Sequence, residues 1–123
     1  MHATAAATLA VLLLTVGITH FLLPSYFRTL VPAWMPFPGA LVAVSGAAEL
    51  AVGAAILLPG SRAAGAWAAA ALLTAYLVSH LDALRVADRA APRLIDRPCG
   101  AVARLAVNAV HIAWAVAVAV TAG

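Results

Sequence analysis

Charged residues are scarce in this sequence, and lysine is absent. Only 9% of the 123 residues are charged, whereas 66% are hydrophobic and the mean hydropathy is +1.07. Soluble globular domains have roughly 25% charged and roughly 45–50% apolar residues. The composition therefore excludes an ordinary soluble domain and indicates an integral membrane protein. Since neither length nor composition points to a second domain, we predict one domain over residues 1–123.

Cysteine is nearly absent, and several chemical motifs are missing altogether. Cys99 is the only cysteine, which excludes an intramolecular disulfide and a metal site made of cysteines alone. The sequence has no phosphate-binding glycine loop and no Ser-His-Asp spacing. Its net charge of +3 comes from seven arginines against four acids, but no stretch mixes basic and aromatic residues. We therefore expect no nucleic-acid partner.

Four long apolar runs dominate the chain. A bilayer core about 30 Å thick is crossed by roughly 20 helical residues, and each run is close to that length. Lipid offers no partner for free backbone amides, and the runs lack the alternation of a membrane barrel, so we predict helices. The third helix is expected to continue past Leu81 and to stop before Pro92. The predicted fold is all-α, an integral membrane four-helix bundle with spans at about 3–23, 39–58, 64–81 and 101–122.

The first run could instead be a cleaved signal peptide. However, it has no basic segment before it, it is 21 residues long, and no convincing small-residue cleavage site follows it. We therefore interpret it as a retained membrane helix.

The arginines are distributed unequally between the two ends of the predicted bundle. With four spans, both termini and the second loop share one side, and Arg62 is the only arginine there. Cytoplasmic loops carry an excess of basic residues. We therefore predict that the first and third loops are cytoplasmic and that the termini face outward. The arginines on the predicted cytoplasmic side are Arg28, Arg85, Arg89, Arg93, Arg97 and Arg104.

The segment between the first two runs is rich in proline and aromatic residues. Pro32, Pro36 and Pro38 remove amide donors and prevent a continuous helix. Trp34 and its aromatic neighbours are typical of residues at head-group depth. We predict a short interfacial segment over one end of the bundle, in which Pro32, Trp34 and Pro36 form a lid.

A few polar side chains interrupt the predicted spans. Polar groups inside a membrane are costly, so each needs an explanation. At about 1.5 Å of rise per residue, all of them fall near the middle of the bundle or in the half next to the first and third loops. We therefore predict a ligand or proton pocket that opens towards these two loops. Its candidate residues are Glu49, His20, His80, Asn108 and His111.

Each candidate also has a structural interpretation. Glu49 can bind a proton or a ligand, or it can be a structural acid. In the second case its hydrogen-bond partner would be Asn108, His111 or Ser45. The two histidines near the interface can be polar anchors instead of ligands. No two of the histidines and Glu49 are three or four residues apart on one helix, so we expect no metal site.

Three stretches of the chain resemble the DoxX family of small bacterial membrane proteins. They cover residues 17–36, 45–62 and 104–114, and they include the motifs Gly17-Ile-Thr-His20, Val31-Pro32-Ala-Trp34 and Gly46-Ala-Ala-Glu49. The resemblance implies a four-helix bundle in the bacterial inner membrane. It also implies an association with membrane redox systems, because DoxX relatives are linked to quinone-coupled thiosulfate oxidation and to oxidative-stress complexes. By matched motif, the candidate site or scaffold positions are His20, Glu49, Gly46, Gly53, Pro32, Trp34 and Arg62.

Three functions remain open at this point. The first is an accessory subunit of a membrane redox system, with a pocket for a quinone or lipid-like molecule or with a proton path. The second is a stand-alone quinone-dependent oxidoreductase, although the sequence has no cofactor motif and no paired thiol. The third is a small transporter or channel component, which would need a homo-oligomer. No cofactor is evident in the sequence, and quinone is the one candidate. The expected partners are the lipid bilayer and a membrane or peripheral redox protein.

Overall fold

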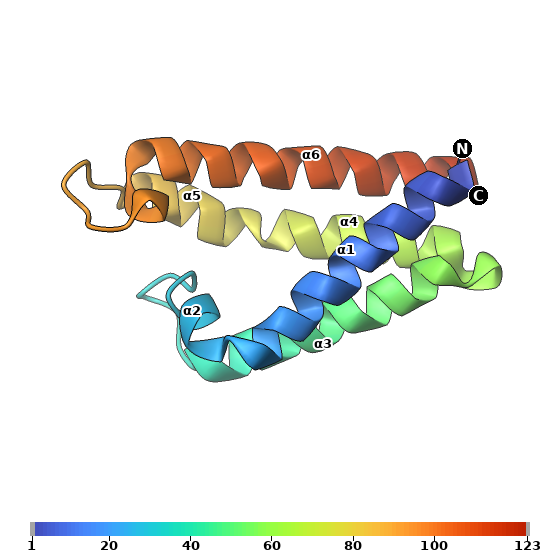
Figure 1. The fold of residues 1–123 in the computed structure, drawn as a ribbon, viewed down its shortest axis with the longest axis horizontal. Coiled ribbons are helices and arrows are strands. Elements are labelled where there is room, and N and C mark those ends of the chain that lie inside the picture. Colours follow the sequence, from blue (N-terminus) through green and yellow to red (C-terminus); the bar gives the residue numbers. More distant parts are fainter. Residues whose placement is uncertain (1, 123) are drawn as a thin grey trace.

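The computed structural model describes residues 2–122, and every regular element in that range is helical. The long helices are α1 (His2–Leu22), α3 (Pro38–Leu57), α4 (Arg62–Ala75) with its continuation α5 (Leu77–Arg85), and α6 (Pro98–Ala122), as Figure 1 shows. Three short elements connect them, namely α2 (Pro24–Arg28), η1 (Pro59–Ser61) and η2 (Leu94–Asp96).

Four helices are long and apolar enough to cross a membrane. They are α1, α3, the stretch Pro59–Arg85 and α6, and the predicted all-α fold class is confirmed. Most predicted ends agree with the structure to within a few residues. The largest difference at a helix start is α6, which begins at Pro98 and not at residue 101, because proline is well suited to the first position of a helix.

The outer surfaces of the long helices are suited to contact with lipid. Val44 on α3 and Val110 on α6 are both more than 60% exposed, and many other large apolar side chains are exposed as well. An apolar exterior is what a hydrocarbon environment requires, since lipid tails cannot solvate polar groups. These surfaces support contact with the lipid bilayer.

The third span contains a slight break that the sequence did not indicate. Tyr76 separates α4 from α5, but the backbone hydrogen bonds continue across it, from Tyr76 N to Leu72 O and from His80 N to Tyr76 O, each at 3.1 Å. The helix then runs on to Arg85. The prediction that it continues past Leu81 and stops before Pro92 is therefore confirmed.

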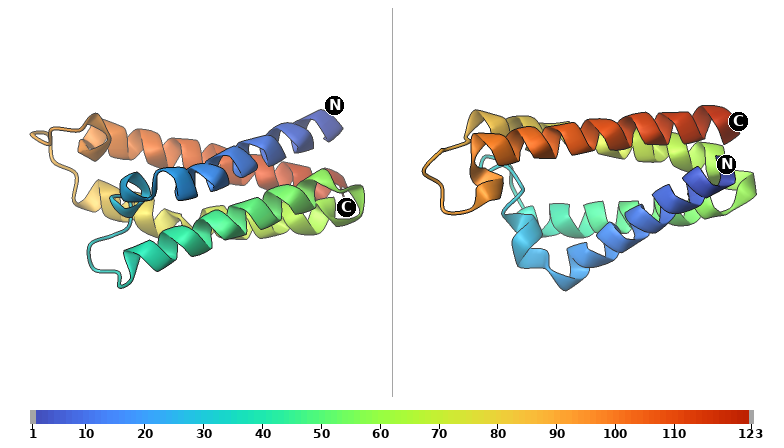
Figure 2. Two further views of the ribbon diagram at one scale, coloured as in Figure 1. Left: turned by 60° about the horizontal axis from the view of Figure 1, so that its bottom comes forward. Right: turned by 45° about the horizontal axis from the view of Figure 1, so that its top comes forward.

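The long helices pack as two pairs. α1 lies against α3, and α4 with α5 lies against α6, while α3 also contacts α4. The pairs meet at one end, which we call the closed end, and its core consists of small and aliphatic side chains such as Leu9, Ile56 and Ala119. Figure 1 and the right-hand view of Figure 2 show the pairs spreading apart towards the other end, the open end.

Glycines allow α1 and α3 to approach closely. A Cβ added at Gly46 would lie 2.7 Å from the Cβ of His20, and one at Gly17 would lie 3.2 Å from the Cβ of Glu49. Gly53 meets Leu14 in the same way. Small residues commonly line such contacts in membranes, where van der Waals packing holds helices together. This seam brings His20 and Glu49 next to each other.

The two ends of the molecule carry different loops. His2 and Ala122 lie at the closed end beside Pro59 and Arg62, all four lining one small cavity there. Figure 1 shows that α1 begins and α6 ends at this end. Arg62 closes the turn between α3 and α4 by donating from Nε to the carbonyl oxygen of Ile56 at 2.9 Å. The first and third loops lie at the open end. Which end faces the cytoplasm stays a prediction.

The first loop combines a short helix with irregular backbone. After α1 the chain forms α2, and from there to Pro38 it makes no longer helix. Phe37 precedes α3 in the left-handed conformation, with φ at 54°, which is uncommon for a bulky residue. α2 contacts both α1 and α3, so the loop folds back over the first helix pair at the open end.

Candidate functional site

A large cavity lies between the two helix pairs. Its volume is about 990 Å³, and side chains from all of the long helices, from α2 and from the first and third loops line it. Most of the lining is apolar, with Val16, Leu41 and Leu72 as examples. The polar residues that the sequence singled out all line this cavity, and they are His20, Glu49, His80, Asn108 and His111.

Glu49 is the most deeply buried of these polar residues. It is only 2% exposed, and its Oε2 lies 3.2 Å from Nδ1 of His20. That nitrogen is closer to the carbonyl oxygen of Val16, at 2.8 Å, and only this second contact has hydrogen-bond geometry. Glu49 Oε2 is therefore left without a hydrogen-bond partner among the described residues. His20 itself stacks on Phe27 of α2, with ring centroids 3.9 Å apart.

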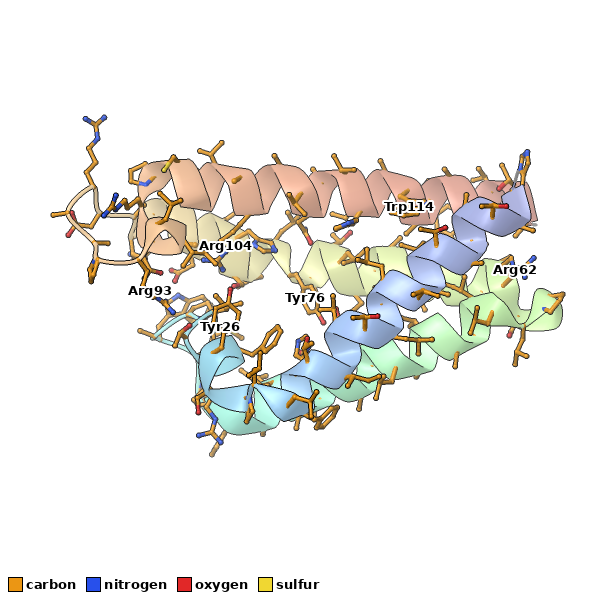
Figure 3. The ribbon with its side chains drawn as sticks, viewed as in Figure 1. Tyr26, Arg62, Tyr76, Arg93, Arg104 and Trp114 are labelled. Carbon is orange, nitrogen blue, oxygen red and sulfur yellow. The ribbon has the colours of Figure 1, made fainter. Side chains whose placement is uncertain are left out.

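Two further buried polar atoms of the cavity also lack partners. They are Oη of Tyr76 and Nδ1 of His80, within the part of the chain that the structure describes. Figure 3 shows Tyr76 pointing into the space between the helix pairs. Buried polar groups are normally hydrogen-bonded, and leaving one unpaired costs about 1–3 kcal/mol. With Glu49, these atoms form a polar cluster, from α3 and the α4–α5 span, that a ligand could satisfy.

Asn108 and His111 take different positions in the cavity wall. Asn108 is buried and donates from Nδ2 to the carbonyl oxygen of Leu73 at 2.9 Å, which links α6 to α4. His111 is half-buried, and its ring lies 6.1 Å from that of Trp114. Neither residue is hydrogen-bonded to Glu49, as the interpretation of Glu49 as a structural acid would require. Ser45 is not either, because its hydroxyl donates to the carbonyl oxygen of Leu41 at 2.7 Å.

Arg104 and Tyr76 line the cavity but were not among the predicted pocket residues. Arg104 is one of the arginines of the predicted cytoplasmic side, and it falls on the same helix stripe as Asn108 and His111. Tyr76 shares a stripe with His80, and tyrosine is common in membrane helices near the interface. In both cases the helix stripe was the signal that could have identified them.

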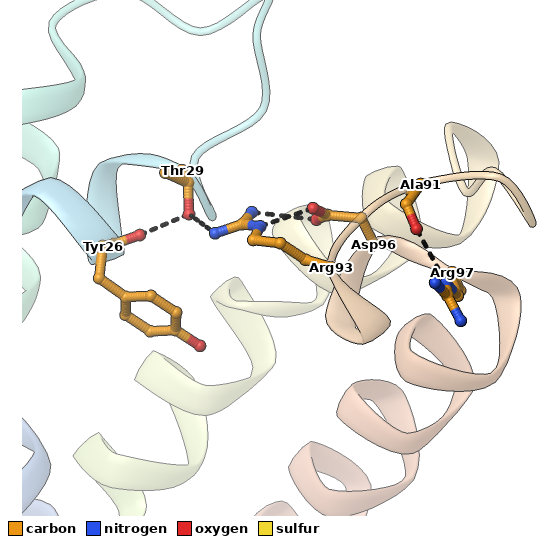
Figure 4. Close-up of polar contacts among 6 residues, drawn as sticks. All are labelled: Tyr26, Thr29, Ala91, Arg93, Asp96 and Arg97. Atoms are coloured by element: carbon orange, nitrogen blue, oxygen red, sulfur yellow. Dashed lines mark hydrogen bonds and ion pairs between the residues drawn. The ribbon is translucent and has the colours of Figure 1, made fainter.

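Three side-chain hydrogen bonds cross the open end and join the first loop to α5 and the third loop, and we call them the mouth contacts. Ser79 Oγ donates to Leu30 O at 2.6 Å, and Trp34 Nε1 donates to Asp82 Oδ1 at 3.0 Å. The third is the donation from Arg93 Nη1 to Thr29 Oγ1 at 3.2 Å, seen in Figure 4.

The three predicted lid residues, Pro32, Trp34 and Pro36, differ in their relation to the cavity. Pro32 lines the cavity, and Trp34 makes one of the mouth contacts while its side chain is 62% exposed. Pro36 is not part of the lining. A lid function for the three residues stays a prediction.

An exposed ion pair stiffens the third loop where it meets the first. Arg93 donates from Nε to Asp96 Oδ2 at 2.7 Å and from Nη2 to Asp96 Oδ1 at 3.1 Å. This hydrogen bonding holds the pKa of the Asp96 carboxyl below its usual range and raises the pKa of Arg93. Both groups therefore stay charged at neutral pH, and Arg93 is held in place to reach Thr29 (Figure 4).

No group of three or more histidine, cysteine, aspartate or glutamate side chains is arranged for a metal ion within residues 2–122. His20 and Glu49 are in contact, but His80 and His111 lie on other helices and His2 lies at the opposite end of α1.

Comparison with known proteins identifies one family. No curated protein and no solved structure matches the chain. Residues 9–119 match the family described as Domain of unknown function (DUF8561), and a relation to the DoxX family is not shown. Four apolar helices and a match over nearly the whole chain lead to one conclusion. The chain is a small multi-pass membrane protein that belongs to the DUF8561 family.

Proposed function

We propose that the protein binds a lipid-soluble amphiphile, of quinone or lipid type, in the cavity between its two helix pairs. The observation that carries this proposal is a cavity of about 990 Å³ between helices long and apolar enough to span a membrane, with a buried polar cluster in its wall. Ligand pockets typically have volumes of about 300–1,000 Å³, with apolar walls and a few convergent polar groups. The apolar lining would contact the ring or chain of the ligand, and the polar cluster would hydrogen-bond to its polar atoms.

Within this proposal the residues have distinct tasks. Glu49, Tyr76 and His80 offer hydrogen-bonding atoms that no other described residue uses. Phe27, stacked on His20, extends the apolar wall towards the first loop. The mouth contacts keep the first loop against α5 and the third loop.

The biological role we propose is that of an accessory subunit of a membrane redox system. The support for it is the resemblance of residues 17–36 and 45–62 to DoxX proteins, which makes quinones the first ligands to test. The sequence has no motif for a redox cofactor of its own, so a membrane or peripheral partner would supply the electron-transfer centre. Quinone turnover by the purified protein alone would instead indicate a stand-alone oxidoreductase.

The proposal is tested by the molecules that remain with the gently purified protein. Mass spectrometry of an organic extract should detect a quinone or lipid in stoichiometric amount. Ala103 lines the cavity, and Ala103→Phe should reduce this occupancy because the added ring takes up cavity volume. Ala109 is exposed on the same helix and is not part of the lining, so Ala109→Phe is the matched control.

Two results would contradict the proposal. One is equal occupancy in the wild type, Ala103→Phe and Ala109→Phe, because a molecule bound in the cavity must respond to its filling. The other is an empty wild-type protein that conducts ions or protons in liposomes, which would favour the transporter or channel hypothesis.

A further inference from the structure

Arg104 is a positive charge placed inside a membrane-spanning helix. It lies six residues after Pro98, or about 9 Å along α6. Its side chain is half-buried and lines the cavity. A charged side chain at such a position is costly unless it is paired, and it often marks a ligand pathway.

No carboxylate of the described chain is paired with Arg104. Asp96 is bound by Arg93, and Asp82 is bound by Arg85 at 2.7 Å. Asp88 accepts from the backbone of its own loop at Ala90 N. No ion pair within residues 2–122 includes Arg104, so its charge is not neutralised by this part of the protein.

Most of the donor capacity of Arg104 is also free. Its only hydrogen bond among the described residues runs from Nη2 to the neutral hydroxyl of Ser79, at 3.3 Å. A guanidinium has five N–H donors in a planar fork. Figure 3 shows Arg104 directed from α6 into the space between the helix pairs, on the side where Tyr26 approaches from α2. Both residues line the cavity.

We infer that Arg104 is the head-group site of the cavity and binds the anionic phosphate or carboxylate of an acidic amphiphile. This inference rests on the proposed function and narrows the ligand to one with a negatively charged head. The guanidinium fork matches both anions in a two-point contact, which a neutral head cannot provide.

The surroundings of Arg104 favour an amphiphile over a free anion. Leu30 and Val31 of the first loop and Ile95 of η2 line the same cavity. These apolar side chains offer no hydrogen bonds to replace the water that a small hydrated anion would lose on entering the cavity. They suit the first part of a hydrocarbon chain whose head is bound by Arg104.

The test compares ligands that differ only in the head group. Oleoyl lysophosphatidate is paired with monoolein, and oleate is paired with oleyl alcohol, and binding to the protein in nonionic detergent is measured by native mass spectrometry and calorimetry. The wild type should prefer at least one acidic member of these pairs by about tenfold or more, since charge-assisted hydrogen bonds are roughly twice as strong as neutral ones. The pair that shows the preference identifies phosphate or carboxylate.

Two variants assign the preference to one side chain. Arg104→Gln should abolish it, and Arg104→Lys should keep part of it because the charge remains while the fork is lost. Arg89 is exposed in the third loop and does not line the cavity, so Arg89→Gln is the control for loss of one positive charge. This control should retain the full preference.

Each failure has its own meaning. An acidic preference that survives in Arg104→Gln overturns the head-group site. Equal binding of acidic and neutral ligands by the wild type also overturns the head-group site, but it leaves the proposed cavity function intact. This comparison needs only the wild type, so it holds even if Arg104→Gln does not fold. Binding of neither class overturns the head-group site, whereas the proposed function is overturned by the occupancy test given above. If inorganic phosphate alone stabilises the wild type as strongly as lysophosphatidate does, Arg104 binds a free anion. The inference that its ligand is an amphiphile is then wrong.

Discussion

Glu49 and His20 illustrate how far single residues can be predicted in a membrane protein. Each is a polar residue in an apolar run, and this alone marked them as candidates. Their contact at 3.2 Å depends on the glycines that bring α1 against α3. The partner of Asn108 could not be predicted, because a bond to the backbone oxygen of Leu73 depends on which helices are neighbours.

Substitution of Glu49 separates its possible roles. Glu49→Gln keeps the size and polarity of the side chain, so we expect the bundle to fold normally. We expect ligand retention to fall, because the amide cannot titrate and offers an N–H donor in place of one acceptor oxygen. Glu49→Ala should in addition lower the free energy of unfolding by about 1–3 kcal/mol, since it leaves a hole beside His20. Thermal unfolding in detergent and mass spectrometry of the bound molecule measure the two effects.

The alternative outcome for this residue is equally clear. Full ligand retention and full activity of the partner complex in the Glu49→Gln variant would remove any proton or ligand role. Glu49 would then be a structural acid whose contact with His20 only holds α1 and α3 together.

At the scale of elements, the α1–α3 seam determines where the polar cluster lies. A Cβ at Gly46 would come within 2.7 Å of the Cβ of His20 and 2.8 Å of Cε2 of Phe21. We therefore expect Gly46→Ala to push the helices apart and to lower the free energy of unfolding by about 1–3 kcal/mol, as overpacking commonly does. Gly60→Ala is the control, because nothing lies within 4 Å of its added Cβ. Equal melting temperatures for the two variants in detergent would show that the seam tolerates a methyl group.

The first loop is the second element whose role can be tested. Trp34→Phe keeps an aromatic ring but removes the hydrogen bond to Asp82 Oδ1. If the loop retains the ligand, this change should speed ligand release by about two- to tenfold, the effect of one modest hydrogen bond. Stopped-flow measurement of ligand release gives the rate. Trp67 on α4 is exposed and makes no side-chain hydrogen bond among the described residues, so Trp67→Phe should leave the rate unchanged. Unchanged release from Trp34→Phe would argue against a lid.

At the scale of the whole molecule, the sequence predicted the number of helices but not the divergence of the two helix pairs towards the open end. Run length and hydropathy were sufficient for four spans. The divergence of the pairs depends on side-chain packing that no periodicity reveals. Ile56 and Ala119 fill the closed end, while near the open end Tyr76 and Arg104 face a cavity. The five polar residues predicted from the sequence nevertheless line this cavity.

The orientation in the membrane is the remaining property of the whole molecule, and Cys99 is a natural reporter of it. The thiol is exposed at the start of α6, at the end of the bundle that carries six of the seven arginines. If this end is cytoplasmic, a membrane-impermeant maleimide should label Cys99 only after spheroplasts are opened. For the opposite end, Gly60→Cys in a Cys99→Ser background places a thiol in open space, and it should be labelled in intact spheroplasts. The reverse pattern in both proteins would invert the orientation and place the arginines, and the mouth of the cavity with them, on the outer face.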